Sequence, residues 1–223
     1  SCCIDIEVIF HILEDERGNE DAARLWSDNH INKELNDINS DFRDTPFRFV
    51  LRKISRHRND RWNDAGNRAG NLNDDVVDKI SKQLREGGGD VLNVYVADGL
   101  CSQGIGGFAQ YPYEHGWFPP DQFSHKDRVF ICASILADST RRATMTHEIG
   151  HWMGLRHTFN GDSCDSDNVN NDYVDDTPQH LSSSDNYDCS NKDRVVDTCR
   201  NQPGADPVRN YMNYSPCRDE FTT

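Results

Sequence analysis

Apolar residues in the first half of the chain switch between strand-like and helix-like spacing. Ile4 to Leu13 is a β-branched, apolar run that is typical of a buried strand. From Phe47 to Arg52, apolar and basic residues alternate, as expected of a half-exposed strand. Between these strands an amphipathic helix is predicted over 28–42, because apolar residues recur at helical spacing at Ile31, Leu35, Ile38 and Phe42.

The same alternation continues as far as Gly154. A second helix is predicted over Val76 to Leu84, where glycines that follow it end the pattern. A third helix is expected to begin near Ser139 or Thr140, either of which can cap it, and to end at Gly154. Further strands are expected at Val91–Ala97, at Val129–Leu136 and, as a short glycine-rich edge strand, at Ile105–Tyr111.

The composition changes sharply at this point. From Leu155 to Thr223 there is little apolar periodicity, and the chain is rich in Asp, Asn, Cys and Pro. Such a segment cannot order itself around a core of its own, so disulfides, metal ions or docking must hold it. We therefore expect an N-terminal part, 1–154, with the sheet and helices, and an irregular C-terminal part, 155–223.

Charge and hydropathy exclude two classes of partner. The 223 residues include 24 Lys and Arg against 38 Asp and Glu, a net charge of −14 that would repel nucleic acid. No apolar run reaches the roughly 18 residues of a membrane span, and the mean hydropathy is −0.83. No charged and apolar leader is present at Ser1, so we expect that any signal peptide has been removed. The expected protein is an acidic, globular monomer that binds neither nucleic acid nor membrane.

The cysteines indicate an oxidising compartment. There are eight, an even number. Four lie in the irregular segment, where a disulfide would stabilise the fold by roughly 2–4 kcal/mol: Cys164, Cys189, Cys199 and Cys217. The alternative is a cytosolic enzyme with reduced core cysteines. We favour a secreted protein.

One motif carries metal chemistry. His147 and His151 are four residues apart on the third helix, so their imidazoles project from one face and can share a metal ion. Glu148 is placed to reach a metal-bound water without being a ligand. A glycine at 154 can take positive φ and return His157 as a third ligand. A surface helix with chance histidines is the alternative, but five specified positions match by chance at only about 10⁻⁴.

The pattern His-Glu-x-x-His-x-x-Gly-x-x-His resembles the metzincin clan of zinc endopeptidases. Asn210 to Tyr214 is similar to the methionine turn of that clan. Longer strings resemble the pappalysin family, which includes fungal secreted metalloproteases: 157–159, 174–178, 197–199 and 206–212. The resemblance implies an α+β fold with a twisted, mostly parallel five-stranded sheet and helices, above an irregular C-terminal subdomain.

The resemblance also implies the roles of the site residues. A secreted zinc endopeptidase would bind Zn²⁺ through the three histidines and use Glu148 as general base, with protein or peptide substrates. Met212 would lie beneath the metal, and Tyr214 would help to stabilise the tetrahedral intermediate. The edge strand would align an extended peptide through Gly106, Gly107 and Phe108.

A calcium site is expected in the acidic loop from Asp162 to Asp176. Its density of hard oxygen ligands suits Ca²⁺, although a merely solvated loop fits the composition equally well. The family resemblance places calcium here and favours a structural ion. The expected ligands are Asp172, the carbonyl of Val174, Asp175 and Thr177.

The resemblance further implies disulfides between Cys164 and Cys199 and between Cys189 and Cys217. Four cysteines remain: Cys2, Cys3, Cys101 and Cys132. Adjacent cysteines rarely bond each other, which favours crosswise pairing of the first two with the last two. The sequence does not choose between the two crosswise arrangements.

Two features depart from the simplest interpretation. Family members that prefer Arg or Lys after the scissile bond have an acid between the methionine of the turn and the next cysteine. None lies between Met212 and Cys217, so we expect a weak preference there. The basic residues from Arg48 to Arg61 could form a heparin-binding patch, but a solvent-facing strand edge is the favoured interpretation.

Two other classes of function compete with the enzyme. One is an inactive metzincin-like module that binds proteins or glycans, which loss of Glu148 or of a ligand histidine would favour. None of these residues is lost. The other is a calcium-dependent adhesion module in which zinc is structural.

Overall fold

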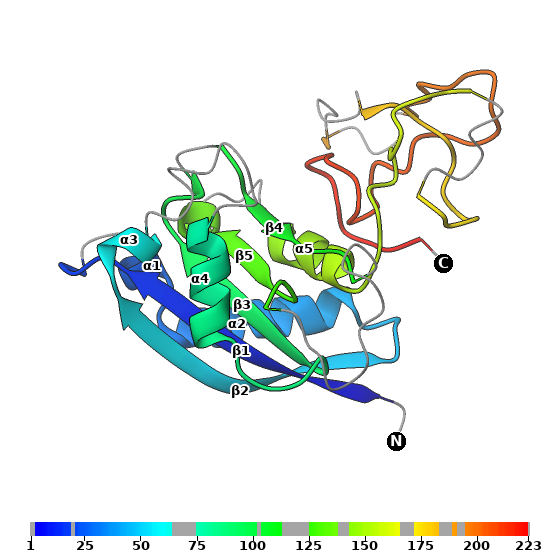
Figure 1. Ribbon diagram of the computed structural model, residues 1–223. Helices are drawn as coiled ribbons and strands as arrows, with labels where there is room; N and C mark the ends of the chain where they lie inside the picture. Colours follow the sequence, from blue (N-terminus) through cyan, green and yellow to red (C-terminus); the bar gives the residue numbers. More distant parts are fainter. Residues whose placement is uncertain are drawn as a thin grey trace. The chain divides into compact units, whose positions relative to one another are not determined.

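The computed structural model describes residues 3–18, 21–63, 75–101, 104–112, 125–137, 143–165, 172–182, 189–190 and 195–222. The chain divides into two compact units, 1–152 and 153–223 (Figure 1). The first holds all the named helices and strands of the described chain.

The first unit is built on a five-stranded sheet in the order β2-β1-β3-β5-β4. Its strands are β1 (Ile4–Glu14), β2 (Phe47–Arg58), β3 (Val91–Ala97), β4 (Gly107–Ala109) and β5 (Val129–Cys132). Neighbours from β2 to β5 run parallel, and β4 pairs with β5 antiparallel. The sheet is therefore mixed and mostly parallel, as expected.

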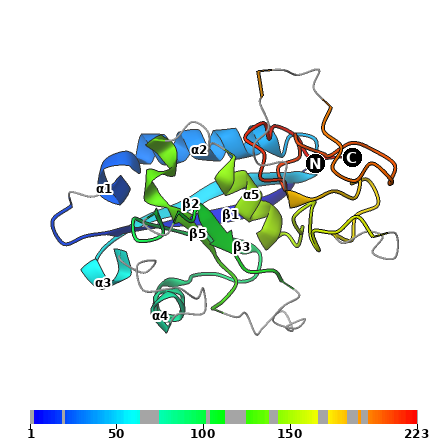
Figure 2. The ribbon, with the colours of Figure 1, turned by 90° about the horizontal axis from the view of Figure 1, so that it is seen from above.

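Helices cover both faces of this sheet (Figure 2). On one face lie α1 (Asp21–Leu25), α2 (Asp28–Asp41) and α5 (Thr144–Trp152), and on the other lie α3 (Asp60–Asn63) and α4 (Asp75–Leu84). Ser27 caps α2 by accepting a hydrogen bond from the backbone N–H of His30. Ile31, Leu35 and Ile38 are the buried positions of α2, in agreement with the predicted amphipathic face.

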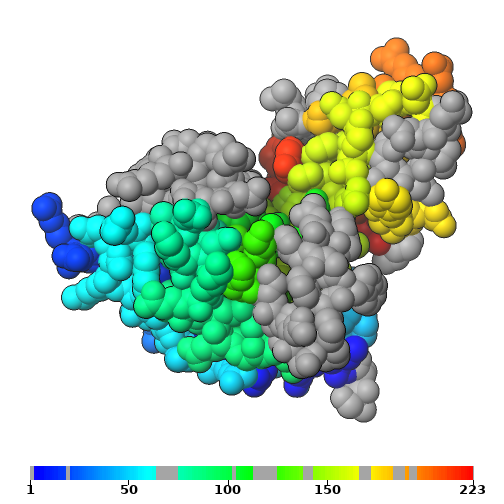
Figure 3. Space-filling view, in the orientation of Figure 1, coloured from blue at the N-terminus to red at the C-terminus, as the bar shows by residue number. Residues whose placement is uncertain are grey.

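An apolar cluster lies between the sheet and α4 in the first unit. Tyr95 at its centre stacks on Phe130, whose other ring contact is Phe108, and both ring pairs are nearly parallel. Val77 and Ile80 of α4 pack against this cluster. In the space-filling view, α4 and the β2–α3 segment form much of the visible described surface over this core (Figure 3).

Several predicted elements end or begin elsewhere. The strand predicted over Phe47–Arg52 continues to Arg58, and the edge strand predicted over Ile105–Tyr111 covers only Gly107–Ala109. The strand expected over Val129–Leu136 ends at Cys132, and a 3-10 helix follows over Ala133–Ala137. The indole N–H of Trp26 donates to the carbonyl of Ala133 at 2.8 Å, which holds the chain where it leaves the sheet. The helix α5 begins at Thr144, while the expected starts at Ser139 and Thr140 lie outside the described residues.

The crosswise pairing expected for the N-terminal cysteines is wrong. Cys101 and Cys132 form a disulfide with each other, with their Cα atoms 5.1 Å apart. Cys101 follows β3 and Cys132 ends β5, and these strands are parallel neighbours whose ends meet at one sheet edge. Cys2 lies outside the described residues. The disulfides implied by the family resemblance, Cys164–Cys199 and Cys189–Cys217, are both present.

The basic residues of β2 face acids along the sheet edge. Arg48 forms a bidentate pair with Asp5 at 2.7 Å, and Arg56 contacts Glu14 at 3.1 Å. Further pairs join Arg52 to Glu7, Lys53 to Glu86 and Arg58 to Glu14. These pairs neutralise the basic run locally, which supports a solvent-facing strand and argues against a heparin patch.

The second unit is irregular. Its described residues contain no named helix or strand, and an isolated bridge joins Asn210 to Glu220. Disulfides and side-chain hydrogen bonds to the backbone order it, as the composition predicts. Among the residues that the structure describes, no helix is long and apolar enough to span a membrane.

Candidate active site

The helix α5 presents His147, Glu148 and His151 from a buried position in the first unit. All three side chains are buried, and Glu148 is only 6% exposed. The rings of His147 and His151 lie one helical turn apart with centroids 4.6 Å from each other. The ring of Tyr111 contacts His151 edge-on at 5.0 Å.

Two polar contacts fix this helix within the first unit. Thr146 donates a hydrogen bond to the carboxylate of Asp41 on α2 at 2.6 Å. At the other end of α5, the indole N–H of Trp152 donates to Asp127 at 2.6 Å. Asp127 also pairs with Arg85. Burial raises the pKa of Asp127, and the bonds from Arg85 and Trp152 oppose that effect.

The edge strand β4 lies directly against Glu148. A Cβ at Gly107 would come within 2.8 Å of the Glu148 Cγ and 2.9 Å of the Phe130 carbonyl oxygen. A side chain at position 107 would therefore collide with Glu148 and with the backbone of β5. The side chain of Phe108 is buried in the core, so only its backbone groups are available to a ligand.

The chain turns after α5 as predicted. Gly154 has φ of 100°, a left-handed conformation that glycine adopts without strain. Ligand nitrogens of His147, His151 and His157 all lie within 4.8 Å of one another, and the three could hold a metal ion. This is the one such group of three or more found among the described residues.

Aromatic rings surround His157 in the second unit. Its imidazole stacks on Phe159 with centroids 4.9 Å apart and contacts Tyr214 edge-on at 4.6 Å. Tyr214 is 48% exposed. Met212 is buried, and its carbonyl accepts a hydrogen bond from the backbone N–H of Thr158 at 3.2 Å. The predicted methionine turn therefore lies beside the segment that carries His157.

Comparison with known proteins now identifies the family. Residues 75–223 match the model of a peptidase family described as "Pregnancy-associated plasma protein-A". The chain belongs to this family, the pappalysins. It is similar to an extracellular metalloprotease of Aspergillus fumigatus, with 30% identity over 99% of this chain and 73% of the relative. Similar enzymes occur in Pyricularia oryzae (34% identity, 90% of this chain, 65% of the relative) and Arthroderma benhamiae (33%, 98% and 68%). This pappalysin is therefore a metalloprotease.

The expected calcium ligands of the pappalysin are partly gathered together. The buried carboxylate of Asp172 accepts hydrogen bonds from the Thr177 hydroxyl and, at 3.1 Å, from the backbone N–H of Val174. Thr177 also contacts the carbonyl of Val174 at 3.2 Å. Burial raises the pKa of Asp172, so a nearby cation would stabilise its charged form. Asp175 is exposed, and 166–171 of the predicted loop lie outside the described residues.

Sequence reasoning missed the contacts that hold the methionine turn. The side chains of Thr158, His180 and Asn213 are buried and hydrogen-bonded to one another. His180 lies outside the histidine motif, so its spacing gives no reason to single it out. Thr158, the hydrogen-bond partner of His180, directly follows His157, the third histidine of the motif. This position was the available sign that Thr158 belongs to the site.

Proposed function

We propose that this pappalysin is a secreted zinc endopeptidase in which His147, His151 and His157 hold Zn²⁺ and Glu148 is the general base. The convergence of three imidazoles within 4.8 Å, with Glu148 on the same helix, carries the proposal. Three neutral nitrogens fit a catalytic zinc, because they leave a coordination position open. The extracellular relatives and three disulfides support secretion.

Each group of the site would have its own role in peptide hydrolysis. Bound zinc supplies Lewis acidity toward water and the scissile carbonyl. Glu148 accepts the proton of the attacking water and passes it to the leaving amine. Tyr214 donates a hydrogen bond from its phenol to the developing oxyanion, for which its partial exposure leaves it accessible.

The edge strand would align the substrate. In the described sheet β4 is the outermost strand beyond β5. The edge of β4 that no described strand occupies can pair with an extended peptide through backbone hydrogen bonds. Because Gly107 contacts Glu148, a peptide on this edge would run past the general base.

Metal removal tests the proposed function. We expect that 1,10-phenanthroline abolishes casein cleavage and that added Zn²⁺ restores it, because the base acts only on a polarised water. Elemental analysis should find about one zinc ion per chain, and His157→Ala should lose it. His30→Ala, which changes an exposed histidine, is the matched control. Activity that survives complete zinc removal would refute the proposal.

Calcium removal should destabilise the protein without removing zinc. We expect a calcium-selective chelator to lower the thermal midpoint by about 5 °C and to speed autolysis, since unneutralised carboxylates repel one another. Thr177→Val should abolish this response, whereas Asp176→Asn should retain it. Unchanged melting and autolysis in the chelator would show that the loop is merely solvated.

We expect weak discrimination at the position after the scissile bond. Tyr214, Ser215 and Pro216 supply no acid, and the carboxylate of Asp219 is held by Arg209 in two bonds of 2.8 Å. A buried Arg or Lys of a substrate would therefore lack a counter-charge there. Peptide-library profiling at 0.15 M salt measures this preference. Tenfold or greater enrichment of Arg or Lys would contradict the expectation, and Asp219→Asn would then test the responsible acid.

A further inference from the structure

A continuous chain of buried hydrogen bonds runs through the second unit beneath the methionine turn. The side-chain amide nitrogen of Asn213 lies 3.2 Å from the hydroxyl oxygen of Thr158. That hydroxyl lies 2.9 Å from the Nε2 of His180, whose Nδ1 is 3.1 Å from the carbonyl of Leu181. His180 is 1% exposed, and Thr158 and Asn213 are also buried.

The donor and acceptor properties of these groups fix the direction of each hydrogen bond. The Leu181 carbonyl can only accept, so the Nδ1 of His180 carries the proton and its Nε2 accepts from the Thr158 hydroxyl. The Thr158 oxygen in turn accepts from the Asn213 amide N–H. Burial lowers the pKa of His180, which agrees with a neutral ring. Every member is therefore satisfied, as a buried polar network requires.

The Asn213 end of this hydrogen-bond chain and its middle member Thr158 flank Tyr214. The Asn213 side-chain carbonyl accepts the backbone N–H of Ser215 at 2.8 Å, which closes a turn around Tyr214. Thr158 lies between His157 and Phe159, and both of those rings contact the Tyr214 ring. The Asn213–Thr158 bond thus joins the backbone of Tyr214 to the segment on which its ring packs.

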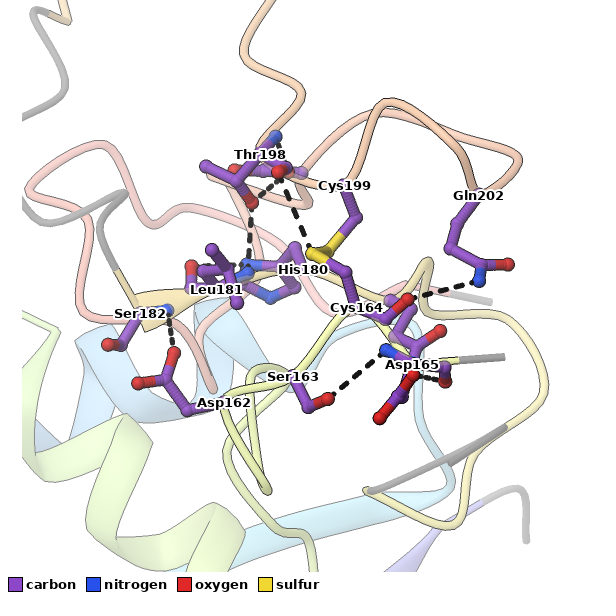
Figure 4. Close-up of a disulfide and its surroundings, with 12 residues drawn as sticks. Asp162, Ser163, Cys164, Asp165, His180, Leu181, Ser182, Thr198, Cys199 and Gln202 are labelled. Atoms are coloured by element: carbon purple, nitrogen blue, oxygen red, sulfur yellow. Dashed lines mark hydrogen bonds between the residues drawn. A yellow bond between two sulfur atoms is a disulfide. The ribbon is translucent and has the colours of Figure 1, made fainter. Parts of the chain in front are cut away.

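The His180 end is anchored independently. The backbone N–H of Leu181 donates to the Thr198 hydroxyl at 2.9 Å, and that of Ser182 donates to Asp162 at 2.8 Å (Figure 4). Asp206 accepts both the N–H and the hydroxyl of Thr198 at 3.0 Å. The neighbouring Cys199 forms its disulfide with Cys164. His180 therefore belongs to a cross-linked segment and serves as a fixed support.

We propose that His180 and Thr158 are positioning residues that, through Asn213, hold the Tyr214 phenol in place for catalysis. This inference rests on the proposed function, because it takes Tyr214 as the group that stabilises the intermediate. Neither residue needs to contact the substrate. Their effect passes through the turn, so a shift of the phenol of about 1 Å would lower kcat by up to about a hundredfold.

The test compares substitutions at Thr158 that differ only in the hydroxyl. Thr158→Val keeps the shape but removes both hydrogen bonds, and we expect kcat to fall about tenfold to a hundredfold with KM for a short peptide changed less than threefold. Thr158→Ser restores the hydroxyl and should recover activity to within threefold of wild type. His180→Phe should resemble Thr158→Val, whereas His180→Gln, which keeps an acceptor near the position of Nε2, should be less affected.

Two further measurements separate positioning from general damage. In a Tyr214→Phe background, Thr158→Val should lower kcat less than twofold further, because the phenol is already absent. The zinc content should stay at the wild-type value in every variant. In the zinc-loaded protein, ¹⁵N chemical shifts should show the Nδ1–H tautomer of His180 in wild type and in Thr158→Ser.

The outcomes distinguish this inference from the proposed function. Equal losses in Thr158→Val and Thr158→Ser, fully additive losses with Tyr214→Phe, or an Nε2–H tautomer would overturn the positioning role while leaving a zinc peptidase. A fully active Tyr214→Phe would overturn the catalytic role of Tyr214 and its positioning together. Loss of activity with loss of zinc in Thr158→Val would assign Thr158 to metal binding and also overturn the inference.

Discussion

Glu148→Ala should lower peptide hydrolysis by about 10²–10⁴-fold while the zinc content and the fold stay unchanged. Glu148 follows the first histidine of the proposed metal triad without belonging to the triad. Its loss therefore removes the proton acceptor and leaves the imidazoles in place. Steady-state cleavage of a fluorogenic peptide, with zinc analysis of the same sample, measures both effects.

The packing around Glu148 determines which control variant Glu148→Ala needs. Gly107 lies so close to the Glu148 Cγ that alanine at 148 would leave a space beside β4. Glu148→Gln fills this space with a neutral amide of the same shape, and it should be as inactive as alanine. An alanine variant that keeps more than a tenth of wild-type activity would contradict the assignment. A fully active glutamine variant would show that packing, and not proton transfer, is the role of Glu148.

The local spacing of apolar residues was sufficient to predict the bounds of the elements in which that spacing is regular. β3 was predicted with its observed bounds, and α2 to within one residue at its end. β5 was predicted four residues too long, because the apolar run through Leu136 continues in a 3-10 helix that apolar spacing does not distinguish from a strand.

The metal motif could be predicted from the sequence because its residues are close together along the chain. His147 and His151 lie on one helical face by the geometry of the helix alone, and Gly154 adopts the positive φ expected from its place after α5. The Cys101–Cys132 disulfide could not be predicted in the same way. It depends on which strands are neighbours, and the order β3-β5 follows from the whole topology.

Gly107 and His180 show why contacts between distant segments escaped prediction. Gly107 has two plausible reasons to lack a side chain, and only the structure shows that Glu148 occupies the space beside it. His180 finds its partner Thr158 at a separation of 22 residues. No periodic pattern links them, because both lie in a segment without regular secondary structure.

The second large effect expected is acid destabilisation through His11, which is buried on β1. Its Nε2 lies 3.0 Å from the side-chain oxygen of Asn93, and its ring stacks on Tyr95 at 4.7 Å. Burial lowers the pKa of His11 to about 4; the hydrogen bond that Nε2–H donates to Asn93 opposes this shift, and the neighbouring His57 adds to it. Above pH 6.5 the ring is neutral in both states, so its contribution to stability is complete.

Below pH 6.5 the unfolded chain binds a proton at His11, whereas the folded protein binds that proton only near pH 4. The free energy of unfolding should therefore fall by about 3 kcal/mol through this site across that window.

His11→Gln, which keeps a polar group near Nε2 but cannot titrate, should be less stable than wild type at pH 7 and lose less stability between pH 7 and 4.5. Acid also releases zinc from the proposed ligands, but it does so in both proteins, so the difference between their urea midpoints isolates His11. His30→Gln is the matched control, since it removes an exposed histidine of α2 and leaves the surroundings of His11 unchanged. Parallel pH profiles for wild type and His11→Gln would show that His11 takes up its proton in the folded state as readily as in the unfolded one.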